Sequence, residues 1–152
     1  MTASGGVIDR LPHRPPMRLV EEVADLVPGA SARGLRVAHA DDWYFQGHFP
    51  DDPVVPAIVL VELLAQTGGL AAATSDDDRQ MRVAAIGPFK FPGGARPNQL
   101  LVARARVVGR IGGMIKIEGE VLADNTLVAA GSVTLAVVGS DLDFCARSVP
   151  QR

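Results

Sequence analysis

The distribution of apolar residues along the chain changes from one nearly continuous run to a strict alternation. Residues 54–74 are apolar at almost every position, and the part from 56 to 73 is rich in alanine, leucine, glutamate and glutamine, which favour helices. Pro56 lies near the start of this segment, where its missing N–H costs nothing. A helix that is apolar on nearly all sides is enclosed by other structure. We therefore predict a buried helix over residues 56–73.

After this helix the apolar residues recur at every second position, which is typical of strands with one covered face. Ile115 and Ile117, for example, alternate with Lys116 and Glu118. The predicted strands cover residues 17–25 and 32–38 before the helix, and 82–91, 99–109, 114–122 and 126–137 after it. The sequences PGAS, IGG and ADNT separate neighbouring strands and predict tight turns.

In the second predicted strand, Leu35 and Val37 alternate with Arg36, so we expect Arg36 on the solvated face. The whole plan is an α+β fold, in which an antiparallel sheet packs against and wraps around one central helix. A length of 152 residues predicts a single domain over 1–152. We expect its ends, at 1–8 and 141–152, to be frayed.

Composition narrows the classes of protein that remain. A formal charge of −2 gives no reason to expect a nucleic-acid partner. The single cysteine, Cys145, excludes an intramolecular disulfide and suits a reducing cytoplasm. The start, MTASGGVIDR, lacks the basic and apolar regions of a signal peptide. Because Glu62 lies inside the most apolar window and a carboxylate is costly in a bilayer, we expect a buried helix there and no membrane span.

His48 and Glu62 are the residues with the clearest chemical potential. His48 lies in a loop with three prolines within seven residues, which restrict its backbone, and Glu62 lies in the apolar helix. A histidine and a desolvated carboxyl group form the commonest acid–base pair. The alternative is structural: a buried glutamate paired with an arginine, and a loop histidine that only donates hydrogen bonds. The spacing alone leaves both open.

Two further features belong to the same helix. If the helix starts near Pro56, the N–H groups of Ala57 and Ile58 lack intrahelical partners and can hold a carbonyl oxygen on which negative charge develops. Gln66 lies one turn after Glu62 on the same face, where it can orient the carboxylate.

Three stretches resemble a known family. LPHRPPMRLVEEV (11–23), YFQGHFPDDPVVPAIVLVELLAQTGGLAA (44–72) and, more weakly, FKFPGGARPNQL (89–100) resemble the 3-hydroxyacyl-[acyl-carrier-protein] dehydratases of fatty acid synthesis, the FabZ/FabA group. The resemblance implies a hotdog fold, in which an antiparallel sheet wraps a long central helix. It also implies a homodimer, with further assembly to hexamers common in the family, in which each active site takes its histidine from one subunit and its acid from the other.

By motif, His48 matches the histidine of the family's GHFP, and Glu62 matches the acid of its helix. The resemblance implies that His48 removes a proton from C2 of a 3-hydroxyacyl thioester and that the partner's Glu62 assists departure of the C3 hydroxyl as water. The substrate-binding positions it implies are Ala57, Ile58, Gln66, Phe49 and Phe91. No metal or redox cofactor is expected, because the 4′-phosphopantetheine arm arrives with the acyl carrier protein.

The chain departs from the family pattern at two glycines, which are Asp51 and Ala57 here. A non-catalytic acyl-binding hotdog subunit and a hotdog thioesterase therefore remain as alternatives. His13, in the matched LPHR sequence, is expected to be structural or to lie at the dimer contact, and His39 carries no signal. Five basic residues could form a patch for an acidic carrier protein, or an ordinary solvated sheet face: Arg96, Arg104, Arg106, Arg110 and Lys116.

Overall fold

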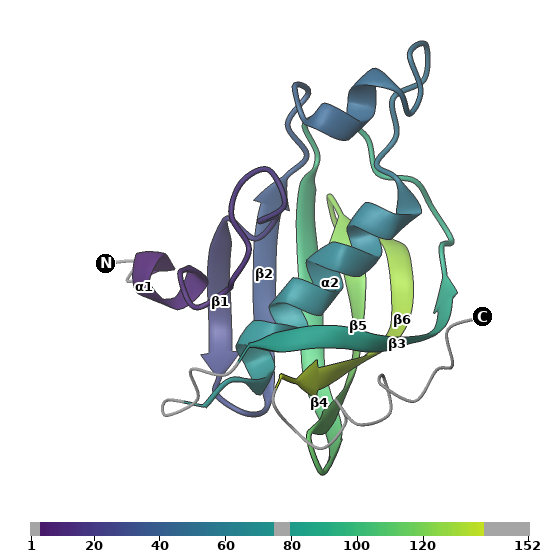
Figure 1. The fold of residues 1–152 in the computed structure, drawn as a ribbon. Helices are drawn as coiled ribbons and strands as arrows, with labels where there is room; N and C mark the ends of the chain where they lie inside the picture. The colour runs from purple at the N-terminus through teal and green to yellow at the C-terminus, as the bar shows by residue number, and fades with distance from the viewer. Residues whose placement is uncertain (1–3, 75–79, 139–152) are drawn as a thin grey trace, which may run out of the picture.

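The computed structural model describes residues 4–74 and 80–138, and within these ranges the chain forms one sheet and one long helix. The elements are α1 (Ser4–Ile8), β1 (Glu22–Val27), β2 (Ser31–Val37), the 3₁₀ helix η1 (Trp43–Gln46), α2 (Ala57–Ala72), β3 (Met81–Lys90), β4 (Leu100–Ile111), β5 (Met114–Ala123) and β6 (Thr126–Val137). The six strands are antiparallel and ordered β1-β2-β4-β5-β6-β3 (Figure 1). This is the α+β hotdog arrangement that the sequence predicted.

The central helix α2 lies against the concave side of the sheet, mainly on β2, β4 and β5, and β3 passes its C-terminal end (Figure 1). Close packing between the helix and the sheet depends on glycine at several contacts, including Gly34 of β2 against Thr67. A Cβ on Gly68 of α2 would lie 2.8 Å from a methyl carbon of Ile117, and a Cβ on Gly119 would lie 2.6 Å from Leu64. Leu63, Leu64 and Ile117 are fully buried in the resulting core. The predicted buried helix over 56–73 is confirmed.

The strands after the helix also follow the prediction, and so do their turns. In the β5–β6 turn, Asp124 and Asn125 have φ values of 45° and 68°, the left-handed conformation that a two-residue hairpin requires. In the β4–β5 turn, Gly112 has φ of 59°. No helix in the described part of the chain has the length and apolar character needed to span a membrane.

The first predicted strand, 17–25, is wrong at its start, because β1 begins only at Glu22. The backbone groups of the preceding segment bond to side chains instead of a neighbouring strand. The Leu19 N–H donates to Gln66 Oε1 over 2.9 Å, and the Met17 carbonyl accepts from Gln66 Nε2 over 2.7 Å. Residues 17–19 are therefore held against α2.

The expected solvated position of Arg36 is also wrong. In β2 the buried face carries Ala32, Gly34 and Arg36, while Leu35 and Val37 are only half buried. The charge of Arg36 is satisfied in this position by Asp42, Glu21 and the carbonyl oxygen of Leu19. Alternation alone cannot reveal such partners.

The prediction of frayed chain ends is also wrong for part of the N-terminus. Residues 4–8, expected to fray, form the short helix α1, and the side chain of Ile8 belongs to the hydrophobic core. Burial of this apolar side chain holds the segment against the sheet. Residues 1–3 and 141–152, the rest of the predicted tails, lie outside the described residues, as does Cys145.

Candidate active site

The carboxylate of Glu62, on one face of α2, contacts two side chains, that of Gln66 on the same helix and that of His13 in the segment before β1. Gln66, one turn further along the helix, donates from Nε2 to Glu62 Oε1 over 2.9 Å. His13 Nε2 lies 3.2 Å from the same oxygen, and the side chains of His13 and Glu62 are each 28% exposed. The carboxylate is thus partly desolvated and fixed in orientation. The predicted role of Gln66 in orienting Glu62 agrees with this geometry.

Gln66 is almost fully buried, and its side-chain amide bonds in three directions. Both N–H bonds of Nε2 are used, one to Glu62 and one to the carbonyl oxygen of Met17, while Oε1 accepts from the Leu19 N–H. The same side chain therefore orients the carboxylate and fastens the segment that carries His13. Sequence reasoning gave His13 a structural or interface role and missed its contact with Glu62; its place in the matched LPHR sequence was the only signal.

A cavity of about 730 Å³ opens beside Glu62. One wall is the face of α2 that carries Glu62, and the others come from the segment before β1, from the start of β3 and from β6. Its lining includes Glu62, His13, Ala65, Gln66, Gly69, Leu70, Ala73, Met81, Val83 and Leu135. Polar side chains at other places, those of Asp9, Arg10, Gln80 and Arg82, line it as well. A cavity with apolar walls and convergent polar groups is typical of a site for a small organic ligand.

His48 lies in the loop between η1 and α2. Its Nδ1 atom is 3.0 Å from the carbonyl oxygen of Val54, which can only accept, so Nδ1 carries the hydrogen. In the neutral ring, Nε2 is then the basic nitrogen, and it has no hydrogen-bond partner among the described residues. The ring stacks on Phe49 with the centroids 4.1 Å apart. This arrangement prepares Nε2 to accept a proton.

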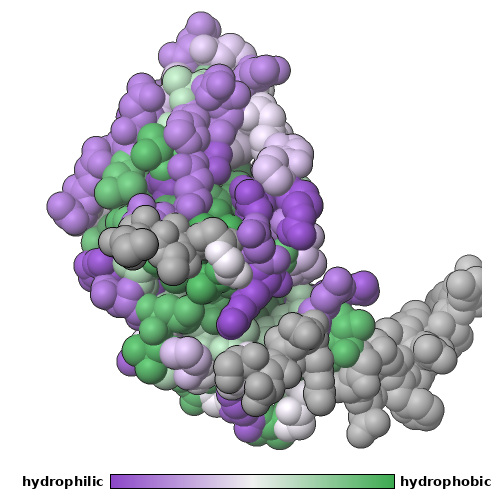
Figure 2. Space-filling view, turned by 90° about the vertical axis from the view of Figure 1, so that its left-hand side faces the viewer, coloured by the Kyte–Doolittle hydropathy of each residue, from purple (hydrophilic) through white to green (hydrophobic). Residues whose placement is uncertain are grey.

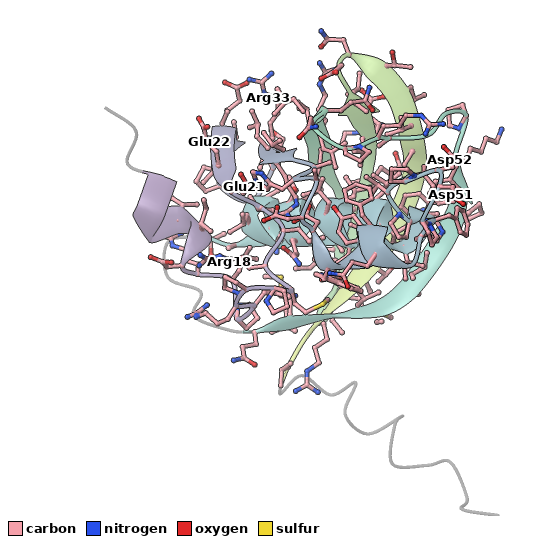
Figure 3. The ribbon with its side chains drawn as sticks, turned by 90° about the horizontal axis from the view of Figure 1, so that it is seen from above. Arg18, Glu21, Glu22, Arg33, Asp51 and Asp52 are labelled. Carbon is pink, nitrogen blue, oxygen red and sulfur yellow. The ribbon has the colours of Figure 1, made fainter. Side chains whose placement is uncertain are left out.

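The loop that carries His48 is tied to its surroundings by several backbone bonds. The N–H of Val54 donates to the carbonyl oxygen of His48 over 3.0 Å, and the N–H of Val55 donates to Ala95 over 2.8 Å. Asp52 in the same loop forms an ion pair with Arg96. Asp51 and Asp52 lie on the opposite side of the molecule from Glu22 and Arg33 of the β1–β2 hairpin (Figure 3).

The 3₁₀ helix η1, which precedes this loop, is anchored by a buried polar cluster that sequence reasoning did not find. Asp42 accepts hydrogen bonds from Arg36 and from the Tyr44 hydroxyl, the latter over 2.8 Å. Burial lowers the pKa of Arg36, but the hydrogen bond and charge of Asp42 outweigh it, so the pKa rises. Burial and the bond to Asp42 also raise the pKa of Tyr44. Arg36 therefore stays charged and Tyr44 stays a donor. His39, which carried no signal, bonds to Glu21 over 2.7 Å at the edge of this cluster.

The first turn of α2 supplies free backbone donors. Pro56 precedes it and provides no side-chain cap, and the N–H groups of Ala57 and Ile58 have no acceptor among the described residues. The positive end of the helix dipole lies at the same place. Both side chains are exposed, that of Ile58 to 75%. These N–H groups are therefore accessible to an acceptor from outside the chain.

The single chain does not bring all the predicted site residues together. The cavity beside Glu62 is lined by Gln66 but not by His48, Ala57 or Ile58. Phe49 and Phe91, the other predicted substrate-binding residues, are about half exposed and also lie outside it. The chain thus presents two separate half-sites: the carboxylate cavity, and the His48 loop with the first turn of α2.

The expected basic patch is largely neutralised. Arg104 and Arg106 of β4 form ion pairs of 3.2 Å and 3.1 Å with Glu120 and Glu118 of β5. Arg96 pairs with Asp52, and Arg110 donates to the carbonyl oxygen of Ala72 at the end of α2. Arg104 and Arg106 therefore lie on a solvated sheet face of mixed charge, whereas Arg96 and Arg110 bond to the His48 loop and to the end of α2. In the part of the chain that the structure describes, no group of three acidic, histidine or cysteine side chains could hold a metal ion.

Comparisons with known proteins agree with this architecture. The chain is similar to curated 3-hydroxyacyl-[acyl-carrier-protein] dehydratases named FabZ from Ruminiclostridium cellulolyticum (32% identical, covering 90% of this chain and 98% of the relative) and Dinoroseobacter shibae (34% identical, covering 90% and 88%). Among solved structures, the dehydratase heterocomplex ApeI:P from Xenorhabdus doucetiae superposes with a TM-score of 0.72 at 16% identity over 93% of this chain and 97% of that one, which shows the shared fold. The model of the FabA-like domain matches residues 11–132. The chain therefore belongs to the family of FabA-like domains.

Proposed function

We propose that the protein removes water from 3-hydroxyacyl thioesters carried on acyl carrier protein and releases trans-2-enoyl thioesters, as a step of fatty acid biosynthesis. One observation carries the proposal: Glu62, oriented by Gln66 and His13, opens onto a cavity whose walls include apolar side chains of α2, β3 and β6 that an acyl chain can contact. The similarity to curated FabZ dehydratases along most of the chain supports the same activity.

In this reaction His48 is the base. Because Nδ1 donates to the Val54 carbonyl, Nε2 keeps its lone pair and faces no competing partner among the described residues. It removes a proton from C2 of the substrate, and the electron pair of that C–H bond forms the double bond between C2 and C3. The loop contacts keep the ring in place, so little entropy is lost in reaching the reactive geometry.

Glu62 completes the elimination. Its carboxyl group gives a proton to the C3 hydroxyl as the C3–O bond breaks, so the leaving group departs as water. The bond from Gln66 fixes the carboxyl group toward the cavity. Afterwards His48 loses the proton it took and Glu62 regains one, so the protein returns to its starting state. No metal or redox cofactor takes part.

The free N–H groups of Ala57 and Ile58 hold the thioester carbonyl. Removal of the C2 proton places negative charge on this oxygen, and donors already aimed at it stabilise that charge. The family's glycine at this position is Ala57 here, which keeps the N–H and adds only an exposed methyl group. Phe49 and Phe91 flank the path by which the pantetheine arm enters.

The two half-sites come together when two copies of the chain pair through β3. This strand is an edge of the sheet, and it exposes Val83 and Ile86, the latter to 61%. An apolar edge with unpaired backbone groups is a surface for strand pairing. The other edge carries charge, with Asp25 of β1 paired to Arg33. On the side of the molecule that carries α1 and β1, hydrophobic and hydrophilic residues are mixed, and only the upper part is mainly hydrophilic (Figure 2). Two β3 strands therefore form the dimer contact.

Ile86→Asp should convert the dimer into monomers and abolish dehydratase activity, because a buried, unpaired carboxylate at the contact is costly. Analytical ultracentrifugation measures the change of mass. The matched control is Ile111→Asp, which places the same charge on a residue that is 84% exposed in the β4–β5 hairpin, away from β3. An Ile86→Asp protein that remains dimeric would rule out β3 as the contact.

Acyl carrier protein is the partner that delivers the substrate, in the cytoplasm, and dimers can assemble further into hexamers. The activity is tested by incubating the purified protein with 3-hydroxybutyryl-acyl carrier protein and following the enoyl product by mass spectrometry. Enoyl product supports the proposal. Release of free thiol without enoyl product would identify a thioesterase instead, and binding of acyl-pantetheine without any turnover would identify a non-catalytic subunit.

A further inference from the structure

The cavity beside Glu62 continues along α2 beyond the polar residues that hold the carboxylate. On the α2 side, Gly69 lies one turn after Gln66, and Ala73, the C-cap residue, follows the end of the helix. Met81 and Val83 of β3 and Leu135 of β6 supply apolar atoms on the other walls. Gln80 and Arg82 also line the cavity, so the extension beyond Gln66 has apolar side chains on several walls and polar ones near the start of β3.

Gly69 differs from its neighbour Gly68 in what surrounds it. A Cβ added to Gly68 would lie 2.8 Å from Ile117 Cγ2, so glycine is required there for the helix to pack on β5. A Cβ added to Gly69 would meet no atom within 4 Å among the described residues. Packing within the described chain therefore does not explain a glycine at position 69.

Glycine inside a helix is also unfavourable. It destabilises a helix interior relative to alanine because it loses more backbone freedom on folding. Gly69 lies in the last turn of α2, but its φ is not in the left-handed range that a C-terminal capping glycine serves, so a capping role does not account for it. What the missing side chain does provide is space in the cavity wall, directly beyond Gln66.

We propose that Gly69 determines the length of acyl chain that the site accepts, and that the extension it leaves open receives the tail of medium- and long-chain 3-hydroxyacyl thioesters. This inference rests on the proposed function, because the reacting end of the chain must lie at Glu62. A four-carbon substrate ends near Glu62 and Gln66, whereas a ten-carbon substrate passes Gly69. A side chain at position 69 then obstructs the second and leaves room for the first.

The test compares 3-hydroxybutyryl and 3-hydroxydecanoyl thioesters of acyl carrier protein with wild type, Gly69→Ala and Gly69→Leu. We expect the ratio of kcat/KM for decanoyl over butyryl to fall stepwise, by about tenfold or more in Gly69→Leu, since each lost methylene contact costs discrimination of that order. The fall in this ratio should come mainly from a higher KM for the decanoyl substrate. Gly68→Ala, which strains the contact with Ile117, should impair both substrates together and leave the ratio unchanged.

Gly69→Ala keeps the experiment interpretable if the leucine variant fails to fold, because a methyl group enters open space and favours the helix. Dimer mass is measured for each variant, since a partner's side chain could instead occupy this space. An unchanged substrate ratio in folded, dimeric variants would overturn the inference. If wild type turns over neither substrate, the proposed function fails, and binding then tests the chain-length role by itself. Weaker binding of decanoyl-pantetheine, but not of butyryl-pantetheine, to Gly69→Leu than to wild type would support that role. Equal binding of decanoyl-pantetheine to the two proteins would refute it.

Discussion

Replacing His48 with alanine should lower kcat/KM for 3-hydroxyacyl-acyl carrier protein by about 10²- to 10⁴-fold, the range expected for loss of a general base. The imidazole is the group whose Nε2 is left free by the bond from Nδ1 to the Val54 carbonyl. The fold should persist, because the loop is also held by backbone bonds from Val54 and Val55. Steady-state assays and circular dichroism measure the two properties.

Glu62→Gln should cause a loss of similar size, since the amide cannot give a proton to the leaving hydroxyl but can still accept the bond from Gln66. His39→Ala is the matched control: it removes an exposed histidine that contacts Glu21 outside the cavity, and we expect activity close to wild type. Activity within about threefold of wild type in both His48→Ala and Glu62→Gln would remove these residues from the mechanism.

The second large effect is on stability. Asp42→Ala should lower the free energy of unfolding by about 3–5 kcal/mol, because it leaves the buried guanidinium of Arg36 without its main charged partner. It also removes the acceptor for the Tyr44 hydroxyl and for the N–H of His39. Urea denaturation followed by fluorescence of Trp43, which makes an edge-to-face contact with Tyr44, measures the change in the free energy of unfolding.

The matched control for Asp42→Ala is Glu120→Ala, which breaks the cross-strand ion pair with Arg104. Both side chains of that pair are well exposed, so the loss should stay at or below about 1 kcal/mol. Equal effects of the two substitutions would show that the Asp42 cluster does not stabilise η1. Because η1 leads directly into the His48 loop, Asp42→Ala should also lower dehydratase activity at urea concentrations too low to unfold the variant.

The sequence was sufficient for elements whose local signals agree. The buried helix follows from a long apolar run of helix-forming residues after Pro56, and the β4–β5–β6 meander follows from alternation between turn sequences. It was insufficient where a distant side chain decides the outcome. Gln66 bonds to the backbone groups of Met17 and Leu19 in place of a neighbouring strand, and Asp42 allows Arg36 to be buried.

The candidate site was predictable to a similar degree. Spacing and residue type singled out His48 and Glu62, and the resemblance gave them roles. The contact between His13 and Glu62 was not predictable, because it depends on where the segment before β1 lies across α2. In the proposed dimer the two half-sites join only through a second copy of the chain, whose position no local pattern in one sequence encodes.

The most direct test of the shared site is complementation between two inactive variants. His48→Ala and Glu62→Gln chains, each with its own affinity tag, are co-expressed and the mixed dimer is purified through both tags. In that dimer one site combines the intact His48 of one chain with the intact Glu62 of the other, and the second site carries both substitutions. The shared site predicts about half of the wild-type activity per dimer. A mixed dimer as inactive as its parents would contradict it.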